Sequence, residues 1–471
     1  MPKINRQEGR RINRRKSTIQ SSFPLKFPPR SSRCLCLVVT LMGFFSMFQK
    51  KSVSGIAPNA MADGAASFVR SGSVPGSTLS TASSSSMLEN RLRGALWGFL
   101  AGDALASPTH WYYGGKRQII QDYGNAITDY TKPHQQLAGS ILNKSDLNGG
   151  GRSKGSNGKS FDKTIIGDVI NHGKQDLWSP QKSIHYHATL QKGENTLEVS
   201  IARVLMRSIV QTGGVFDAEH FRNAYVKFMT TPGSHNDTYA STCHRMFFAN
   251  MIFRQLPPKD CPDNDQHNVD TMDGLVLPTI VALSGVRNSN NSIDPASIDQ
   301  AGADCASVTR RSSVLEKVSS QWAKVVVSAV TETNDDAFQQ SLNEFSRQTI
   351  RRLPNPQVND DSTMSACYLS SALPGLIDMT AKYLPSGTSN GGERVWEGLL
   401  ANANVGGENV HRGSVLGAVL GARAGATQLP PHMIEGLYPH DELAKEIDDF
   451  VRVVLPEAGP STTTEVSVEQ Q

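Results

Sequence analysis

The chain has few cysteines for its length, and their positions exclude a disulfide or zinc framework. The 471 residues include six cysteines, at positions 34, 36, 243, 261, 305 and 367, and only the first two lie close together. Disulfide-rich domains and structural zinc sites need paired cysteines at short, regular spacings. We therefore interpret the four scattered cysteines as ordinary core or loop thiols.

The sequence also lacks an apolar run long enough for an ordinary membrane span. Such a span needs roughly 20 apolar residues, whereas the apolar stretch at residues 34–48 numbers fifteen. It follows a basic arm and precedes small residues at 62–67 and a serine-rich linker at 80–86. This combination is typical of a targeting segment. We expect residues 1–86 to be a disordered arm that directs the chain to an organelle or the secretory route or, alternatively, contacts the membrane as a short anchor.

A strong excess of one charge is missing outside that arm. Residues 1–33 hold ten Lys or Arg and one Glu, which leaves 37 basic and 42 acidic side chains in the rest of the chain. The net charge of +4 therefore reflects the arm, and the remainder is mildly acidic. A basic patch on the fold is the usual electrostatic mark of a nucleic-acid-binding surface. We expect no nucleic-acid partner.

Strand-like alternation of apolar and polar residues is not sustained anywhere in the chain. Apolar residues recur instead at helical spacing, for example at Leu197, Ile201 and Val204. The pattern predicts an all-α domain over residues 87–455, with long loops at 149–159, 255–270 and 285–312, and a disordered tail at 456–471. The predicted helices span residues 88–106, 196–211, 218–229, 239–253, 315–331, 336–352, 364–383, 394–403, 413–427 and 443–454.

Two of the predicted helices carry glycines four residues apart. The first has Gly94, Gly98 and Gly102, and the second has Gly413, Gly417, Gly421 and Gly425. Residues four apart lie on one helix face, and each interior glycine costs about 0.8–1 kcal/mol relative to alanine. The stripes therefore indicate a close backbone contact, and we expect the two helices to pack against each other. Their polar ends, Asp103 and residues 406–411, would then reach a common cavity.

Two polar clusters lie in the first half of the predicted domain, and each has a structural as well as a functional interpretation. In residues 102–111, Asp103 and His110 are followed by Trp111, an aromatic side chain suited to a ring-shaped ligand; alternatively, Asp103 bonds the loop backbone. The second cluster is Glu194 and Asn195, where Asn195 followed three residues later by Glu198 also forms a capping box.

Two further clusters precede later helices. His235 and Asp237 stand before an aromatic-rich helix, where they also form a helix-start signature, and His185 and His187 lie upstream without a diagnostic spacing. The last cluster, Glu408-Asn409-Val410-His411, follows a Gly406-Gly407 turn. It places a carboxylate and an imidazole three residues apart, a spacing that puts two metal ligands on one helix face.

These clusters, in this order, resemble the ADP-ribosylglycohydrolase family over residues 88–427. The family has a Gly-Asp-Ala-Leu motif after a glycine-striped helix, here residues 102–110. Its Thr-Asp-Asp-Thr motif corresponds to residues 193–196, and its Gly-Gly-Asp-x-Asp-Thr motif to residues 406–411. The resemblance implies an all-α helical bundle whose cleft holds two magnesium ions. It also implies hydrolysis of the glycosidic bond that joins ADP-ribose to a protein side chain or a small acceptor.

The chain departs from the family at the residues that carry the chemistry. His110 replaces a glutamate, Glu194 and Asn195 replace the two aspartates of the second motif, and Glu408 and His411 replace an aspartate and a threonine of the last. Magnesium prefers near-octahedral oxygen ligands, so we do not expect a paired magnesium site. We expect at most one divalent ion, magnesium, manganese or zinc, held by Glu194, Asn195, Glu408 and His411. An imidazole ligand favours manganese, zinc or iron over magnesium.

Two hypotheses of function follow. In the first, the protein is a hydrolase of a small-molecule or ADP-ribosylated protein substrate, with Glu194 or Glu408 as base or ligand and His110 or His235 as acid. The expected substrate-binding residues are Asp103, Trp111, His235, Asp237, Gly406 and Gly407, with the glycine turn receiving phosphate. In the second, it is a non-catalytic ADP-ribose or nucleotide binder, or a structural protein of the same fold. We expect Glu194, Asn195, Glu408 and His411 to converge on one cavity, which would be the functional site.

Overall fold

The computed structural model describes residues 78–150, 162–179, 181–286, 295–385 and 390–456. The predicted apolar segment 34–48, most of the predicted arm and the tail from residue 457 lie outside the described residues, as does most of the predicted loop 149–159. Among the helices that are described, none is long and apolar enough to cross a bilayer.

The described residues fold into fourteen α-helices joined by loops and short single turns, and they contain no strand. The prediction of an all-α fold is therefore confirmed. The helices are α1 Thr78–Ala106, α2 Gly115–Tyr123, α3 Leu197–Gln211, α4 Ala218–Thr230, α5 Thr242–Phe253, α6 Val276–Ser284, α7 Pro295–Thr309, α8 Ser313–Thr331, α9 Asp335–Ile350, α10 Leu369–Tyr383, α11 Gly391–Val405, α12 Val410–Ala424, α13 Pro431–Glu435 and α14 His440–Val454.

The ten predicted helices all exist, but four others were missed. Helix α6 is buried on all sides, so its sequence has no polar face and no helical period. Helix α7 lies within residues 285–312, which were predicted to form a loop. That prediction is wrong for the residues of α7, because its many small side chains give only a weak helical pattern. Helices α2 and α13 are short. Helix α1 starts at Thr78, so the whole serine-rich stretch at 80–86, assigned to a linker, is helical. No proline or glycine lies between Gly76 and Gly94 to interrupt it, and serine is tolerated in helices.

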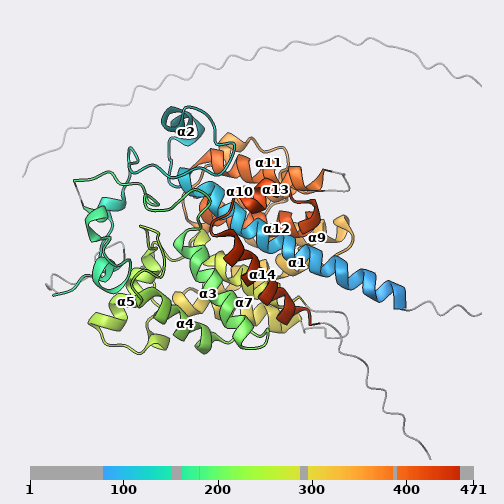
Figure 1. The fold of residues 1–471 in the computed structure, drawn as a ribbon, viewed down its shortest axis with the longest axis horizontal. Helices are drawn as coiled ribbons and strands as arrows, with labels where there is room; N and C mark the ends of the chain where they lie inside the picture. The colour runs from blue at the N-terminus through green and yellow to red at the C-terminus, as the bar shows by residue number, and fades with distance from the viewer. Residues whose placement is uncertain (1–77, 151–161, 180, 287–294, 386–389, 457–471) are drawn as a thin grey trace, which may run out of the picture. The chain divides into compact units, whose positions relative to one another are not determined.

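The two glycine-striped helices, α1 and α12, run side by side with their backbones in contact (Figure 1). A Cβ atom on Gly98 would lie 2.0 Å from the carbonyl oxygen of Gly417, and one on Gly417 would lie 2.0 Å from the carbonyl oxygen of Gly98. Gly102 and Gly413 oppose each other in the same way. No side chain fits at these points, so the backbones of the two helices lie in direct contact. The predicted contact is confirmed.

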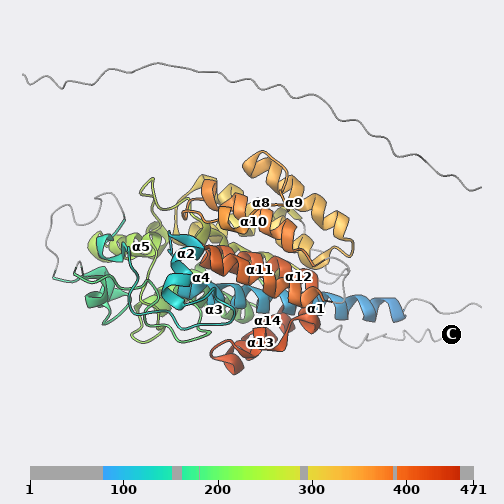
Figure 2. The same cartoon turned by 90° about the horizontal axis from the view of Figure 1, so that it is seen from above.

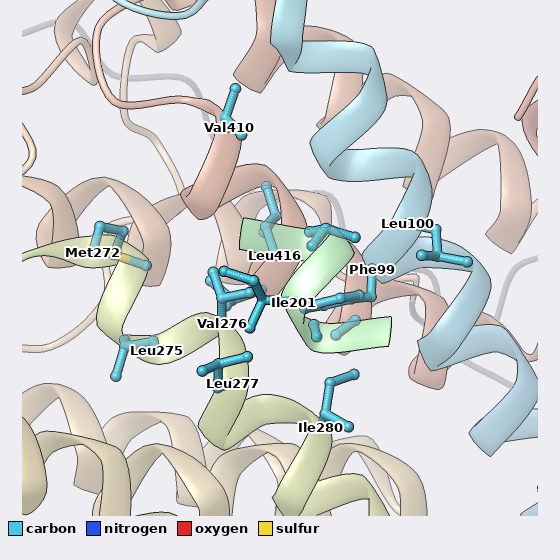
Figure 3. Close-up of a cluster of buried hydrophobic side chains, with 14 of the residues drawn as sticks. Phe99, Leu100, Ile201, Met272, Leu275, Val276, Leu277, Ile280, Val410 and Leu416 are labelled. Carbon is cyan, nitrogen blue, oxygen red and sulfur yellow. The ribbon is translucent and has the colours of Figure 1, made fainter. Parts of the chain in front are cut away.

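The remaining helices surround this pair. Helices α8, α9 and α10 lie on one side of α11 and α12, and α13 and α14 lie on the other (Figure 2). A cluster of buried apolar side chains fills the space between α1, α3, α6 and α12, including Phe99, Ile201, Val276 and Leu416 (Figure 3). This core fixes the C-terminal end of α1 beside the N-terminal ends of α3 and α12, which is where the polar clusters lie.

We predict that Gly98→Ala lowers the free energy of unfolding by about 1–3 kcal/mol or more, because the added methyl group must displace the backbone of α12. Chemical denaturation of the wild type and of Gly98→Ala measures this change. Gly302→Ala in α7 is the matched control, since its nearest neighbour would be 3.3 Å from the new methyl group. We expect that control to change stability by less than about 1 kcal/mol, because the gain in helix propensity offsets the tight contact. An equal effect of the two substitutions would contradict the packing argument.

Candidate active site

A small cavity of about 40 Å³ lies where the end of α1, the start of α12 and the loops before α5, α6 and α10 meet. Its wall is formed by Trp111, Tyr239, Ser241, Thr242, Asn268, Thr271, Asp273, Cys367, Glu408 and His411. A water molecule occupies about 30 Å³ in the liquid, so the cavity has room for a water or an ion. It combines two carboxylates and an imidazole with aromatic walls, which is the composition of a reactive site rather than of a packing defect.

The Gly406-Gly407 turn places Glu408 at this cavity. Both glycines have positive φ, 69° and 63°, which glycine adopts at little cost. The Gly407 N–H is donated to the carbonyl of Tyr112, and the Glu408 N–H to the carbonyl of Ser365. These two amides are therefore used within the protein and are not free to receive a phosphate. The turn serves to aim the side chain of Glu408.

Buried amide and guanidinium groups hold the start of α12 in place. Asn409 donates through Nδ2 to Thr109 Oγ1 at 2.8 Å, and Asn402 donates to the carbonyl of Asn409 at 2.7 Å. Arg412, fully buried, donates through Nε to Asn402 Oδ1 and through Nη1 to the carbonyl of Thr363, both at 2.7 Å. Burial lowers the pKa of Arg412 to about 10. This network ties the first turn of α12 to the end of α1.

Glu408 and His411 form a buried charged pair at the cavity. Glu408 Oε1 lies 2.5 Å from His411 Nδ1, and both side chains are almost completely shielded from solvent. Burial opposes the charging of either group, but the carboxylate raises the pKa of His411 to about 10. In return, His411 and His110 hold the pKa of Glu408 well below its usual range. The three-residue spacing noted in the sequence therefore does bring Glu408 and His411 together, but the two side chains bond to each other.

The second carboxylate oxygen of Glu408 faces His110. Glu408 Oε2 and His110 Nε2 are 3.6 Å apart, which is too long for a hydrogen bond, and neither atom has a hydrogen-bond partner among the described residues. His110 Nδ1 lies 2.7 Å from His187 Nε2, and His187 Nδ1 lies 2.8 Å from Asp237 Oδ1. Burial lowers the pKa of His110 to about 4, so this imidazole is neutral at pH 7.

Asp103 and Asp237 hold the first turn of α3 from outside the helix. Asp103 accepts hydrogen bonds from the Thr196 N–H and Thr196 Oγ1, both at 2.7 Å, and from Asn195 Nδ2 at 3.0 Å. Asp237 Oδ2 accepts the Leu197 N–H at 2.8 Å. The predicted capping box is wrong, because Asn195 turns to α1 and Glu198 bonds residues of α5. Both aspartates are buried and used within the protein, so the expectation that they bind substrate is not met in this conformation.

Two other predicted residues lie away from the cavity. Glu194 is half-buried, and its Oε2 accepts hydrogen bonds from the Gln191 N–H at 2.7 Å and from Asn236 Nδ2 at 3.1 Å. Gly193, at φ 74°, packs against the Gly436 carbonyl and fixes this direction. His235 lies against Phe228 with 5.9 Å between ring centroids. The prediction that Glu194 and Asn195 converge with Glu408 and His411 on one cavity is therefore wrong, because Glu194 faces a loop and Asn195 is held under α1.

A second buried cluster joins Glu198 to His244. Glu198 Oε1 accepts hydrogen bonds from His244 Nε2 at 2.8 Å and from Ser241 Oγ at 2.6 Å, and His244 Nδ1 lies 2.7 Å from the Tyr225 hydroxyl. Burial opposes ionisation, but His244 lowers the pKa of Glu198 to about 2, and the pKa of His244 is raised well above its usual value. Although Cys243 lies close by, both imidazole nitrogens are engaged, so the arrangement is that of an ion pair rather than a metal site.

Sequence reasoning missed the residues that connect these groups. His187 was noted only as one of two upstream histidines, and Asp273, which lines the cavity, was not singled out. Neither has a local sequence signal, because each contact joins segments that are distant along the chain. Asp273 also pairs with buried Arg310, whose Nη1 lies 3.1 Å away. Of the predicted site residues, the structure brings together His110, Trp111, Glu408 and His411 at the cavity.

The model of the ADP-ribosylglycohydrolase family matches residues 84–459. The chain belongs to the ADP-ribosylglycohydrolase family. No curated protein matches it. Among solved structures it is similar to one described as an "ADP-ribosylglycohydrolase-related protein complex", at 15% sequence identity and a TM-score of 0.46, over 78% of this chain and 99% of the other.

The residues at this site do not fit the paired magnesium ions that the resemblance to the family implies. Magnesium keeps oxygen ligands and several waters, whereas the groups gathered here are two imidazoles and Glu408. Glu194 is bonded elsewhere, so a second carboxylate from that motif does not reach the site. His110 Nε2 and Glu408 Oε2, which have no hydrogen-bond partner among the described residues, face the same space; with the proton of His110 on Nδ1, the two atoms fit a single cation.

The Glu198–His244 pair generates a prediction on acid stability. The folded-state pKa of Glu198, about 2, lies below its ordinary value of 4.5, so its contribution is present above about pH 4.5 and is lost as the pH falls toward 2. Glu198→Gln should lower the free energy of unfolding at pH 7 by about 3–5 kcal/mol, since it leaves buried His244 unpaired. It should also flatten the dependence of stability on pH between 4.5 and 2.

Denaturant unfolding at a series of pH values measures both effects. Glu219→Gln, at an exposed position in the first turn of α4, serves as the control and should change stability by less than about 0.5 kcal/mol. The same acid dependence in wild type and Glu198→Gln would show that another group controls acid unfolding.

Proposed function

We propose that this protein hydrolyses a glycosidic bond of ADP-ribose, or of a related nucleoside or glycoside, at the cavity lined by Trp111 and Glu408. The observation that supports this most is that His110 Nε2 and Glu408 Oε2 are buried 3.6 Å apart without hydrogen-bond partners. Buried polar atoms left without partners are costly unless a cation or a hydrogen-bonding group of the substrate meets them. Membership of the ADP-ribosylglycohydrolase family supports the reaction class.

One divalent ion is the cofactor that these residues suit. His110 and Glu408 each offer an atom without a hydrogen-bond partner, and these two atoms are 3.6 Å apart. His411, expected as a third ligand, is instead paired with the other oxygen of Glu408. Imidazole and carboxylate ligands together favour zinc, manganese or iron over magnesium. Such an ion, when bound, supplies a water molecule that ionises near neutral pH. Glu194 and Asn195, expected as ligands from the sequence, have no part in this set.

The side chains of the cavity are assigned the charge-stabilising and proton-transfer roles that hydrolysis needs. Glycoside cleavage passes through a transition state with positive charge on the sugar ring, and the negative charge of Glu408 stabilises that charge at close range. Asp273 is the other carboxylate of the cavity wall and is assigned to accept the proton of the attacking water. His411, positively charged because of Glu408, is assigned to donate a hydrogen bond to the leaving group.

Substrate entry requires the aromatic wall to move. The cavity volume of about 40 Å³ is too small for a ribose ring. Trp111 has a φ of 66°, an uncommon value for a bulky residue, and its indole nitrogen has no partner among the described residues. Tyr113, next to Trp111, is exposed, and its ring lies 5.6 Å from the indole. We assign Trp111 and Tyr239 to contact the sugar or base of the substrate once the wall has opened.

We predict that the full-length protein releases ADP-ribose from at least one ADP-ribosylated protein or small molecule, and that Glu408→Gln reduces the rate at least a hundredfold. Chromatographic measurement of free ADP-ribose over a panel of such substrates tests this. Glu344→Gln on α9, an exposed position, is the control and should retain the wild-type rate. If ADP-ribose binds but is not released from any substrate, the non-catalytic binder is the better account.

We also predict that zinc or manganese stabilises the wild-type protein more than magnesium does. At a hundredfold excess over the dissociation constant, one ion adds about 2.7 kcal/mol to the free energy of unfolding. Thermal unfolding with and without each metal measures this. Glu408→Gln should lose the metal-dependent increment, whatever its own stability without metal, and Glu344→Gln should keep it. Equal melting with all three metals in the wild type would remove the single-ion hypothesis.

A further inference from the structure

Asp273 is held in the cavity wall differently from the other buried carboxylates. Asp103, Asp237 and Glu198 each accept hydrogen bonds from backbone amides or side chains of other residues. Asp273 is 6% exposed, and its Oδ1 has no hydrogen-bond partner among the described residues. The polar contact that the structure shows for this carboxylate is an ion pair. The direction of the Asp273 side chain therefore depends on the cation that pairs with it.

The guanidinium of Arg310 is that cation. Arg310 Nη1 lies 3.1 Å from Asp273 Oδ1, but neither atom has a hydrogen-bond partner among the described residues, so charge rather than an aligned hydrogen bond joins them. Arg310 is 2% exposed. Burial opposes its charge, but the carboxylate of Asp273 outweighs burial and raises the pKa of Arg310. A contact of this kind restrains a carboxylate while leaving its lone pairs free to accept.

The chain next to Arg310 is fixed to the loop that leads into the cavity wall. The Arg311 N–H is donated to the carbonyl of Asp263 at 3.2 Å, and Ser312 donates through Oγ to the carboxylate of Asp270. The end of this loop contributes side chains to the cavity. Because the backbone of Arg310 is tied to the same loop, its guanidinium has a defined place relative to the wall.

We propose that Arg310 is a positioning residue that holds Asp273 at the point from which it accepts the proton of the attacking water. This inference rests on the proposed function, in which Asp273 has that role. As the water oxygen bonds to the anomeric carbon, its proton passes to Asp273, and the electron pair of the broken glycosidic bond stays with the leaving group. Such a transfer requires the carboxylate to lie within hydrogen-bond reach of the water. A displacement of about 1 Å can cost about a hundredfold in rate.

Arg310→Lys in the full-length protein separates position from charge. The ammonium group keeps the positive charge that the buried carboxylate needs, but it is a point charge on a shorter side chain, so Asp273 moves with it. We expect the rate of ADP-ribose release at saturating substrate to fall about tenfold or more. The dissociation constant for ADP-ribose, measured by titration calorimetry, should stay within about threefold of the wild-type value, because Asp273 acts on the water.

Asp273→Asn provides the background in which Arg310 should lose its effect. On its own, this change should lower the rate about 10²–10⁴-fold, the usual contribution of a general base. Adding Arg310→Lys to Asp273→Asn should lower the rate by less than about twofold more, because residues that act as a unit are not additive. A purely structural role of Arg310 would lower the rate by the same factor in both backgrounds.

Arg352→Lys is the matched control. Arg352 pairs with Asp378 through two hydrogen bonds, of 2.8 and 2.6 Å, and Asp378 is 4% exposed but is not among the described residues that line the cavity. The variant therefore makes the same substitution beside another buried aspartate. We expect its rate of ADP-ribose release to stay within about threefold of the wild-type rate, because distant sites act independently.

The outcomes separate the two proposals. If the wild type releases no ADP-ribose from any substrate of the panel, the proposed function fails, and the role of Arg310 fails with it. If the wild type is active and Arg310→Lys keeps its rate, the positioning role fails while the proposed function stands. An equal loss in both backgrounds, or a loss matched by weaker ADP-ribose binding, would likewise overturn the positioning role. Melting temperatures show whether each variant is folded.

Discussion

Contact between the backbones of α1 and α12 is the constraint on which the rest of this structure depends. Glycines at facing positions leave no room for any side chain between the two helices. The absence of side chains at the contact costs helix propensity and is offset by close packing along the whole interface. As a result the segment that follows α1, with His110 and Trp111, is pressed against the first turn of α12, with Glu408 and His411. The close contact of α1 and α12 therefore brings the polar side chains of the site together.

Buried charge is the second organising feature. Carboxylates in the interior are expensive unless they are paired or hydrogen-bonded, and Glu198, Asp237 and Asp273 each meet a cationic or donor group. At Glu408 one oxygen is matched by His411, while the other lies 3.6 Å from His110 Nε2 without a hydrogen-bond partner. A buried carboxylate oxygen left without a partner at a cavity marks a place where function and stability differ in their demands.

The sequence predicted the scaffold better than the site. The glycine stripes identified the contact of α1 and α12, because four-residue spacing has few other physical causes. Helices with a polar face were recognised, whereas α6, apolar all round, was not. At the site, Glu408 and His411 were found because they are neighbours on one turn. Glu194 was misplaced because the turn at Gly193 decides its direction, and His187 was missed because its partners come from segments 77 and 50 residues away.

The capping of α3 by side chains from other segments has a further consequence. A helix that caps its own first turn can fray without disturbing its neighbours, but here the amides of Thr196 and Leu197 are held by Asp103 and Asp237. Exchange of these two amide hydrogens with solvent requires their hydrogen bonds to the carboxylates to break. Movement of Asp237 also breaks its contact with His187, which in turn contacts His110. The local opening of this turn and the loss of order at the cavity are therefore one event with one free energy. The exchange rates of these two amide hydrogens therefore indicate whether the side chains of the site are in place.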